Sequence, residues 1–70
     1  MTHALLSDLY IQKRYLQNEI ESRDKFSNEQ PLIWLNSVKG RLYCSKTGLL
    51  YRVLYDLSQS IKTFEKFDEL

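Results

Sequence analysis

The sequence predicts an all-α fold: a small three-helix arrangement whose long N- and C-terminal helices pack as an antiparallel hairpin with a short middle helix. The first observation is the stretch 49–67, where large apolar residues recur at the i, i+3, i+4, i+7 spacing of one helix face. The second is the stretch 3–23, which has no glycine or proline and many good helix formers. The third is a short apolar segment that lies between Pro31 and Gly40.

The C-terminal helix, predicted over residues 49–67, carries the clearest apolar stripe of the chain. At 100° per residue the stripe falls within an arc of about 100°, the width that a core-facing helix shows. Phe67 lies at its edge, and polar residues such as Arg52 and Gln59 lie opposite. The stripe should therefore pack against the rest of the chain, through Leu50, Val53, Leu54, Leu57, Ile61 and Phe64.

The N-terminal helix, predicted over residues 3–23, carries a second apolar face. This face consists of Leu5, Leu9, Leu16 and Ile20, with Leu6 at its margin. Lys13 falls on the same face, where its alkyl stem can lie along the core or its ammonium can meet a partner's carboxylate. Ile11 and Tyr15 lie on the opposite side, either as singly exposed apolar residues or as a surface for a protein partner.

The middle of the chain predicts a polar loop over residues 24–30 and a short helix over 32–39, with a strand as the alternative for the latter. Pro31 suits the first position of that helix and Gly40 its end. Residues 41–48 are expected to form a loop or a ragged helical turn in which Ser45 or Thr47 caps the last helix, or a hairpin turn. One end of the core should be closed by Trp34, Leu35, Val38 and Leu42.

Length and composition predict one small domain, residues 1–70, of marginal stability as a monomer. Neither a disulfide nor a metal site is available to stabilise it, because Cys44 is the only cysteine and His3 the only histidine. Oligomerisation or a partner is the usual remedy. The single cysteine suggests a reducing cytoplasm. No apolar run is long enough for a membrane span, and the N-terminus does not resemble a signal peptide.

The segment 40–47, GRLYCSKT, is one residue away from the pattern G-x-x-x-x-G-K-[ST], with Ser45 in place of the second glycine. It resembles the phosphate-binding loop of nucleotide-hydrolysing enzymes, a resemblance that implies phosphate contact by Lys46 and magnesium binding by Thr47. That family needs a parallel sheet built from several crossover units of about 30 residues each. A chain of 70 residues has no room for it. We therefore predict no enzyme, no cofactor and no small-molecule substrate.

The same region is free of acidic residues between Glu29 and Asp56. It holds a basic segment, residues 39–52, with four cationic side chains: Lys39, Arg41, Lys46 and Arg52. The stretch 35–57 resembles the helix-turn-helix of bacterial regulators, in which the second helix enters the major groove of DNA. This resemblance implies nucleic-acid binding through the basic segment.

Tyr51, Arg52 and Tyr55 lie beside one another on the flank of the last helix, and tyrosine and arginine are enriched at binding hot spots. The flank is either a partner-binding surface or the margin of the core. Taken together, the sequence favours a non-enzymatic regulatory or adaptor protein that acts through protein–protein contacts, as a homo-oligomer or with a larger partner. A small helix-turn-helix-like DNA-binding regulator is the alternative.

Overall fold

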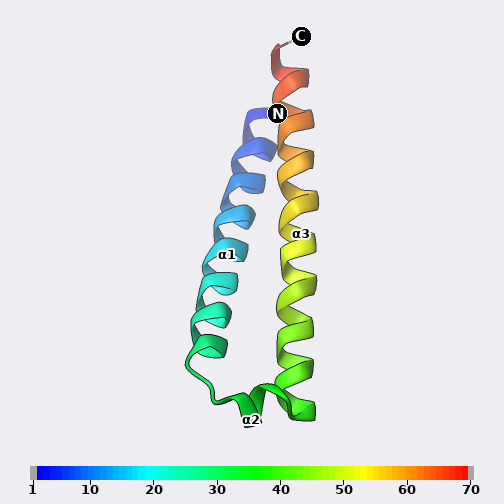
Figure 1. Ribbon diagram of the computed structural model, residues 1–70. Helices are drawn as coiled ribbons and strands as arrows, with labels where there is room; N and C mark the ends of the chain where they lie inside the picture. Colours follow the sequence, from blue (N-terminus) through cyan, green and yellow to red (C-terminus); the bar gives the residue numbers. More distant parts are fainter. Residues whose placement is uncertain (1, 70) are drawn as a thin grey trace.

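Two long helices run side by side in opposite directions and are joined at one end by a single helical turn (Figure 1). The computed structural model describes residues 2–69, with side chains from residue 5 to residue 67. The helices are α1 (Thr2–Asn28), α2 (Leu32–Leu35) and α3 (Val38–Glu69). The predicted antiparallel hairpin with a short middle helix is therefore confirmed. No strand occurs in residues 2–69, so the strand and hairpin alternatives were wrong.

The hairpin is long and thin, with extents of 53 × 14 × 13 Å and a radius of gyration of 15.9 Å. A compact domain of this length would have a radius of gyration of about 11 Å. The shape arises because α1 and α3 each have only one long neighbour. Each helix can therefore bury only a narrow strip of its surface.

The core is the strip along which α1 and α3 meet. Ile20 and Ile61 are its buried apolar side chains, as their positions on the predicted faces indicated. Around them lie half-buried residues of both helices: Leu6, Leu9, Lys13, Leu16, Leu50, Leu54, Leu57 and Phe64. Leu5 and Val53 were predicted to be part of the core, but both are exposed. Val53 lies at the edge of its apolar arc, and a single neighbouring helix does not reach that far around α3.

An aromatic cluster closes the end of the hairpin that carries α2. The Phe26 ring lies 5.5 Å from the Trp34 ring and 5.1 Å from the Tyr43 ring, centroid to centroid, and the Trp34 and Tyr43 rings are 5.8 Å apart. The prediction of Trp34, Leu35, Val38 and Leu42 as the closing residues was half wrong. Trp34 and Leu35 are half-buried, whereas Val38 and Leu42 are largely exposed.

The same cluster explains why α1 continues past the predicted end at residue 23. The segment 24–28 was expected to be a loop because of its polar composition, but it is helical. An additional helical turn brings the Phe26 ring into contact with Trp34 and Tyr43. This tertiary contact outweighs the polar composition of residues 24–28, which by itself favours a loop. The loop shrinks to residues 29–31, and α2 ends at Leu35 instead of residue 39.

The beginning of α3 differs most from the sequence prediction. The Gly40 backbone N–H donates a hydrogen bond of 3.1 Å to Ser37 Oγ, so Ser37 is the N-cap of α3. Gly40 was predicted to end a helix, but it lies inside the first turn of α3. A Cβ atom there would lie 2.0 Å from the Trp34 carbonyl oxygen. Glycine at this position therefore lets the backbone of α2 approach α3 closely.

The segment 41–48 is continuous α-helix, so the loop and the hairpin predicted for it were wrong. The alternative of a ragged helical turn was right about helical structure but wrong about a break before the last helix. Ser45 and Thr47 are not caps. The Thr47 hydroxyl instead donates to the Tyr43 carbonyl oxygen one turn earlier, at 3.1 Å.

Candidate functional site

The first predicted partner surface lies on α1. Ile11 is 49% exposed and Tyr15 is 68% exposed. Together with Arg14 and Asn18 they line a shallow depression of about 230 Å³ that contains residues of α1 only. An apolar pair beside an arginine, on a helix face with no neighbour, has the composition of a contact surface for another protein. Its role in binding remains a prediction.

The second predicted surface lies on α3, and one of its three residues lies at the margin of the core. Tyr51 is at the margin of the core: its hydroxyl donates a hydrogen bond to Asp24 of α1, which raises the pKa of Tyr51. It also lines a depression between the helices together with Gln17 and Glu21. Tyr55 and Arg52 are exposed.

The structure does not bring the two surfaces together. The depression at Ile11 and Tyr15 lies on α1 alone, whereas Tyr51 lies at the seam between α1 and α3. A second tyrosine bridges the seam, because the Tyr10 hydroxyl donates to Glu65 Oε1, which raises the pKa of Tyr10. The surfaces are thus two separate candidates.

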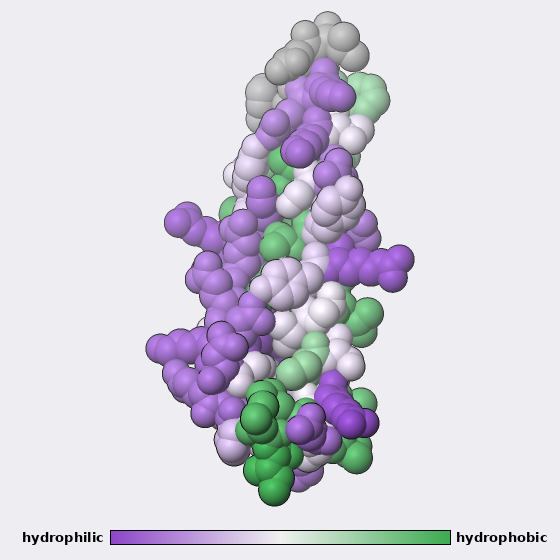
Figure 2. Space-filling view, in the orientation of Figure 1, coloured by the Kyte–Doolittle hydropathy of each residue, from purple (hydrophilic) through white to green (hydrophobic). Residues whose placement is uncertain are grey.

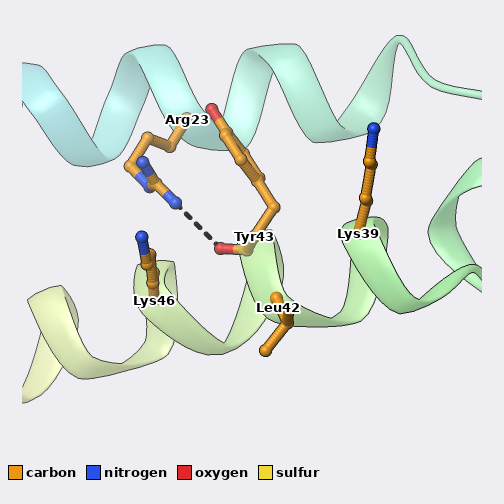
Figure 3. Close-up of a pocket in the computed structure, with 5 residues that line it drawn as sticks. All are labelled: Arg23, Lys39, Leu42, Tyr43 and Lys46. Carbon is orange, nitrogen blue, oxygen red and sulfur yellow. Dashed lines mark hydrogen bonds between the residues drawn. The ribbon is translucent and has the colours of Figure 1, made fainter.

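The basic segment does not form one face. Lys39 and Lys46 extend from α3 toward α1 on either side of Tyr43, and with Arg23 and Leu42 they line a shallow groove of about 260 Å³ (Figure 3). Arg41 and Arg52 are exposed elsewhere on α3. At 100° per residue, Arg41 lies about 160° around the helix from Lys39. A flat or curved binding surface could therefore contact only part of the predicted set.

In residues 2–69 the structure contains neither the phosphate-binding loop nor the helix-turn-helix turn that the two sequence resemblances imply. Residues 40–47 were compared with a phosphate-binding loop, and the stretch 35–57 with a helix-turn-helix that turns around Ser45. Both regions are occupied by the uninterrupted helix α3 from Val38 onward. The predicted turn was wrong, and the backbone N–H groups of residues 42–47 point along a helix instead of around an anion.

Arg23 is the residue that the sequence analysis missed. Its Nε donates to Thr47 Oγ1 and its Nη2 donates to the Tyr43 carbonyl oxygen, each at 2.9 Å (Figure 3 shows the second bond). Its guanidinium carbon lies 3.9 Å from the centroid of the Tyr43 ring. Arg23 Nη1 is also 3.9 Å from Glu19 Oε1. These contacts make Arg23 a clamp between α1 and α3.

No local signal marks this role, because the partners of Arg23 lie 20 and 24 residues further along the chain. Arg23 stood at the expected end of a helix, where a basic residue is ordinary. Only the arrangement of the hairpin brings its guanidinium to Thr47, which is the buried polar residue of the described chain.

No cluster of three or more metal-ligating side chains occurs among the described residues, and His3 lies outside the described side chains. None of the described helices is both long and apolar enough to cross a membrane. Comparison with protein-family models, with curated protein sequences and with solved structures found no match to this chain.

Proposed function

We propose that the chain is a non-enzymatic regulatory or adaptor protein that acts by binding other protein chains. The observation that supports this most is the amount of surface that the hairpin leaves exposed. The chain exposes 5792 Å². A folded monomer of 8.4 kDa is expected to expose about 4,600 Å².

The excess of about 1,200 Å² is comparable with the area that one partner contributes to a large protein–protein interface. Much of the exposed surface is apolar. Figure 2 shows apolar residues gathered at the end that carries α2 and at intervals along the α3 side. At the α2 end these residues include Leu32 and Ile33, which are 75% and 82% exposed.

The non-enzymatic part of the proposal rests on the sequence, which supplies no nucleophile with an adjacent base and no pair of carboxylates in contrasting surroundings. We further propose the cytoplasm as the place of action. Cys44 is free and exposed, a state that a reducing compartment maintains.

One observation favours the nucleic-acid alternative. Lys39 and Lys46 lie at one groove with Arg23, and no carboxylate lines that groove. Such a cluster could contact two or three phosphates. Binding would then weaken steeply as salt rises, with a slope set by the number of phosphates contacted.

The test of the adaptor function compares tagged wild-type protein with two double variants in cell extract. Ile11→Ser/Tyr15→Ser removes the α1 surface. Leu49→Ser/Val53→Ser removes an equally spaced exposed apolar pair from α3 and is the matched control. The proposal expects a stoichiometric protein complex that only the first variant loses.

The proposal is overturned if wild-type protein captures no partner that depends on the α1 surface and sediments as a folded monomer. The nucleic-acid alternative is tested with the same protein in a mobility-shift assay from about 50 to 200 mM salt. A shift that falls with salt and is abolished by Lys39→Glu/Lys46→Glu would replace the adaptor with a nucleic-acid-binding protein.

A further inference from the structure

The end of the hairpin that carries α2 holds the most exposed large apolar side chains of the described residues. They are Leu32 and Ile33 of α2 and Val38, the first residue of α3, and are called the apolar tip below. Each is at least 75% exposed, whereas the next in exposure, Tyr15, is 68% exposed. Figure 2 shows apolar residues gathered at this end. Singly exposed apolar residues are ordinary, but three at one end of a rod 53 Å long indicate a contact with an apolar medium or partner.

The charges of the chain are distributed unevenly between the two ends of the hairpin. Residues 23–48, which form the end with α2, carry five cations and two acids, Asp24 and Glu29, and so have a net charge of +3. The rest of the chain has a net charge of −2, because the total is +1. The hairpin is therefore a rod with one positive end, and the apolar tip lies at that end.

Lys39 and Arg41 lie on opposite sides of α3, in its first turn next to the tip. Figure 3 shows Lys39 extending toward α1, and Arg41 lies about 160° away around the helix. Their Cα atoms differ by only about 3 Å in height along the helix axis. Helix side chains lean toward the N-terminus of their helix, which for α3 is the end with the tip. A surface parallel to the hairpin can contact only one of these cations, whereas a flat surface perpendicular to the hairpin contacts both.

From these three observations we infer that the apolar tip inserts into the interface of an anionic membrane, with the hairpin standing on the membrane surface. The tip residues enter the boundary between headgroups and acyl chains, and Lys39 and Arg41 contact lipid phosphates on either side of them. Binding of this kind depends on buried apolar area together with attraction to anionic lipids, and this end of the hairpin supplies both. The cytoplasmic leaflet of cell membranes is anionic, which agrees with the proposed place of action.

The same observations favour a membrane over the two other kinds of partner. A nucleic acid offers phosphates but no apolar medium for Leu32 and Ile33. A protein pocket would need acids on opposite walls around the tip to meet Lys39 and Arg41, whereas an anionic membrane presents phosphates in every direction of its plane.

The test measures cosedimentation with vesicles made of equal parts of phosphatidylglycerol and phosphatidylcholine. The wild-type chain should bind these vesicles, and Leu32→Ser/Ile33→Ser should bind them more weakly by about tenfold or more, because burial of two large apolar side chains is lost. Leu49→Ser/Val53→Ser is the matched control, since it removes an exposed apolar pair farther along α3. It should change binding by less than about twofold.

The role of charge is tested with the same vesicles at about 0.1 M salt, where charges more than about 10 Å apart are largely screened. Lys39→Glu/Arg41→Glu should weaken binding by about tenfold or more, and vesicles of phosphatidylcholine alone should have a similar effect on the wild-type chain. Arg52→Glu/Lys62→Glu makes the same change of net charge, but Arg52 lies about 16 Å farther along α3 than Arg41. This control should weaken binding by less than about threefold.

Far-ultraviolet circular dichroism checks that every variant remains helical, which is expected because all the substituted side chains are exposed. A second measurement tests the orientation of the hairpin. In a Cys44→Ser background, a polarity-sensitive dye attached at Ile33→Cys should brighten on vesicles, and the same dye at Val53→Cys should not. Equal brightening at both positions means that the hairpin lies flat, and it overturns the inferred contact.

Three other results also overturn the inference. The first is a wild-type chain that does not bind the anionic vesicles. The second is Leu32→Ser/Ile33→Ser that binds them as tightly as wild type, because the attraction is then purely electrostatic. The third is a wild-type chain that binds no vesicles while Leu32→Ser/Ile33→Ser loses a protein from cell extract, because the tip is then a protein-binding surface.

The inference goes beyond the proposed function and does not depend on it. Ile11 and Tyr15 lie on α1 and outside the apolar tip, so Ile11→Ser/Tyr15→Ser should bind vesicles as wild type does. A chain that captures a protein through the α1 surface but binds no vesicles overturns the membrane contact alone. A chain that binds vesicles as expected but captures no protein overturns the adaptor function alone.

Discussion

The two glycines of α3 should respond to alanine substitution in opposite directions. Gly40 and Gly48 both have helical backbone, and neither has a positive φ, so alanine fits the dihedral angles of both. A Cβ atom on Gly48 would have no other atom within 4 Å. Because alanine has the higher helix propensity, Gly48→Ala should stabilise the protein by about 0.5–1 kcal/mol.

The same substitution at Gly40 meets the backbone of α2. The new Cβ would lie 2.0 Å from the Trp34 carbonyl oxygen and 2.9 Å from Leu35 Cα, and these atoms cannot rotate away. Overpacking costs about 1–3 kcal/mol, and such a close approach to backbone atoms belongs at the upper end, about 3 kcal/mol, of which the gain in helix propensity offsets about 1 kcal/mol. We therefore expect Gly40→Ala to destabilise the protein by about 2 kcal/mol, with the strain relieved by displacement of α2.

The assay is urea unfolding followed by circular dichroism at one fixed protein concentration, because the stability of any chain that self-associates depends on its concentration. Trp34 fluorescence reports the displacement of α2, and it should change in Gly40→Ala but not in Gly48→Ala. Destabilisation by Gly48→Ala would refute the reasoning, because it would mean that residue 48 lies in a turn that needs glycine. A neutral Gly40→Ala would mean that α2 does not pack on α3.

Three further predictions concern the contacts between α1 and α3. Arg23→Met should destabilise the protein by about 2–3 kcal/mol through loss of two charged hydrogen bonds. A double-mutant cycle with Thr47→Val should show a coupling energy of at least about 0.5 kcal/mol, and additivity would contradict the clamp. Ile61→Ala should cost about 2–5 kcal/mol in urea unfolding, and a loss below 1 kcal/mol would contradict its burial. The raised pKa of Tyr51 means that its neutral hydroxyl stabilises the folded state below pH of about 10, and that this contribution is lost as pH rises through the folded pKa. Asp24→Asn should lower the pKa of Tyr51, followed by NMR of the tyrosine ring, and an unchanged pKa would contradict the hydrogen bond.

The sequence predicted the interior of the long helices well, because periodicity is a property of many residues at once. Ile20 and Ile61 were placed on apolar faces by spacing alone, and both are buried. The width of the buried strip was overestimated. Val53 belongs to the apolar arc by its spacing, but whether it is buried depends on the number of helices that pack around α3. The periodicity of one helix does not give that number.

The turn end of the hairpin was predicted poorly because local and tertiary signals conflict there. Gly40 and Gly48 lie on either side of residues 41–47, and glycines at such positions are typical of turns. In the structure Gly40 is required because α2 approaches α3 closely there, whereas Gly48 is an ordinary helical position with free space around it. The contacts of Arg23 could not be predicted from the sequence, because its hydrogen-bond partners lie 20 and 24 residues further along the chain. The exposure of Ile11 and Tyr15 agrees with the side of the N-terminal helix on which they were predicted, and Tyr55, for which the sequence left a core-margin position open, is exposed as well.

Sedimentation of the tagged wild-type chain in cell extract, beside Ile11→Ser/Tyr15→Ser, tests the central claim most directly, because the claim is that the chain acts by binding other protein chains. The wild-type chain should sediment in a complex well above 8.4 kDa, and the double variant should sediment as the free, helical chain. A fully helical wild-type chain that sediments at 8.4 kDa both alone and in extract would contradict the account.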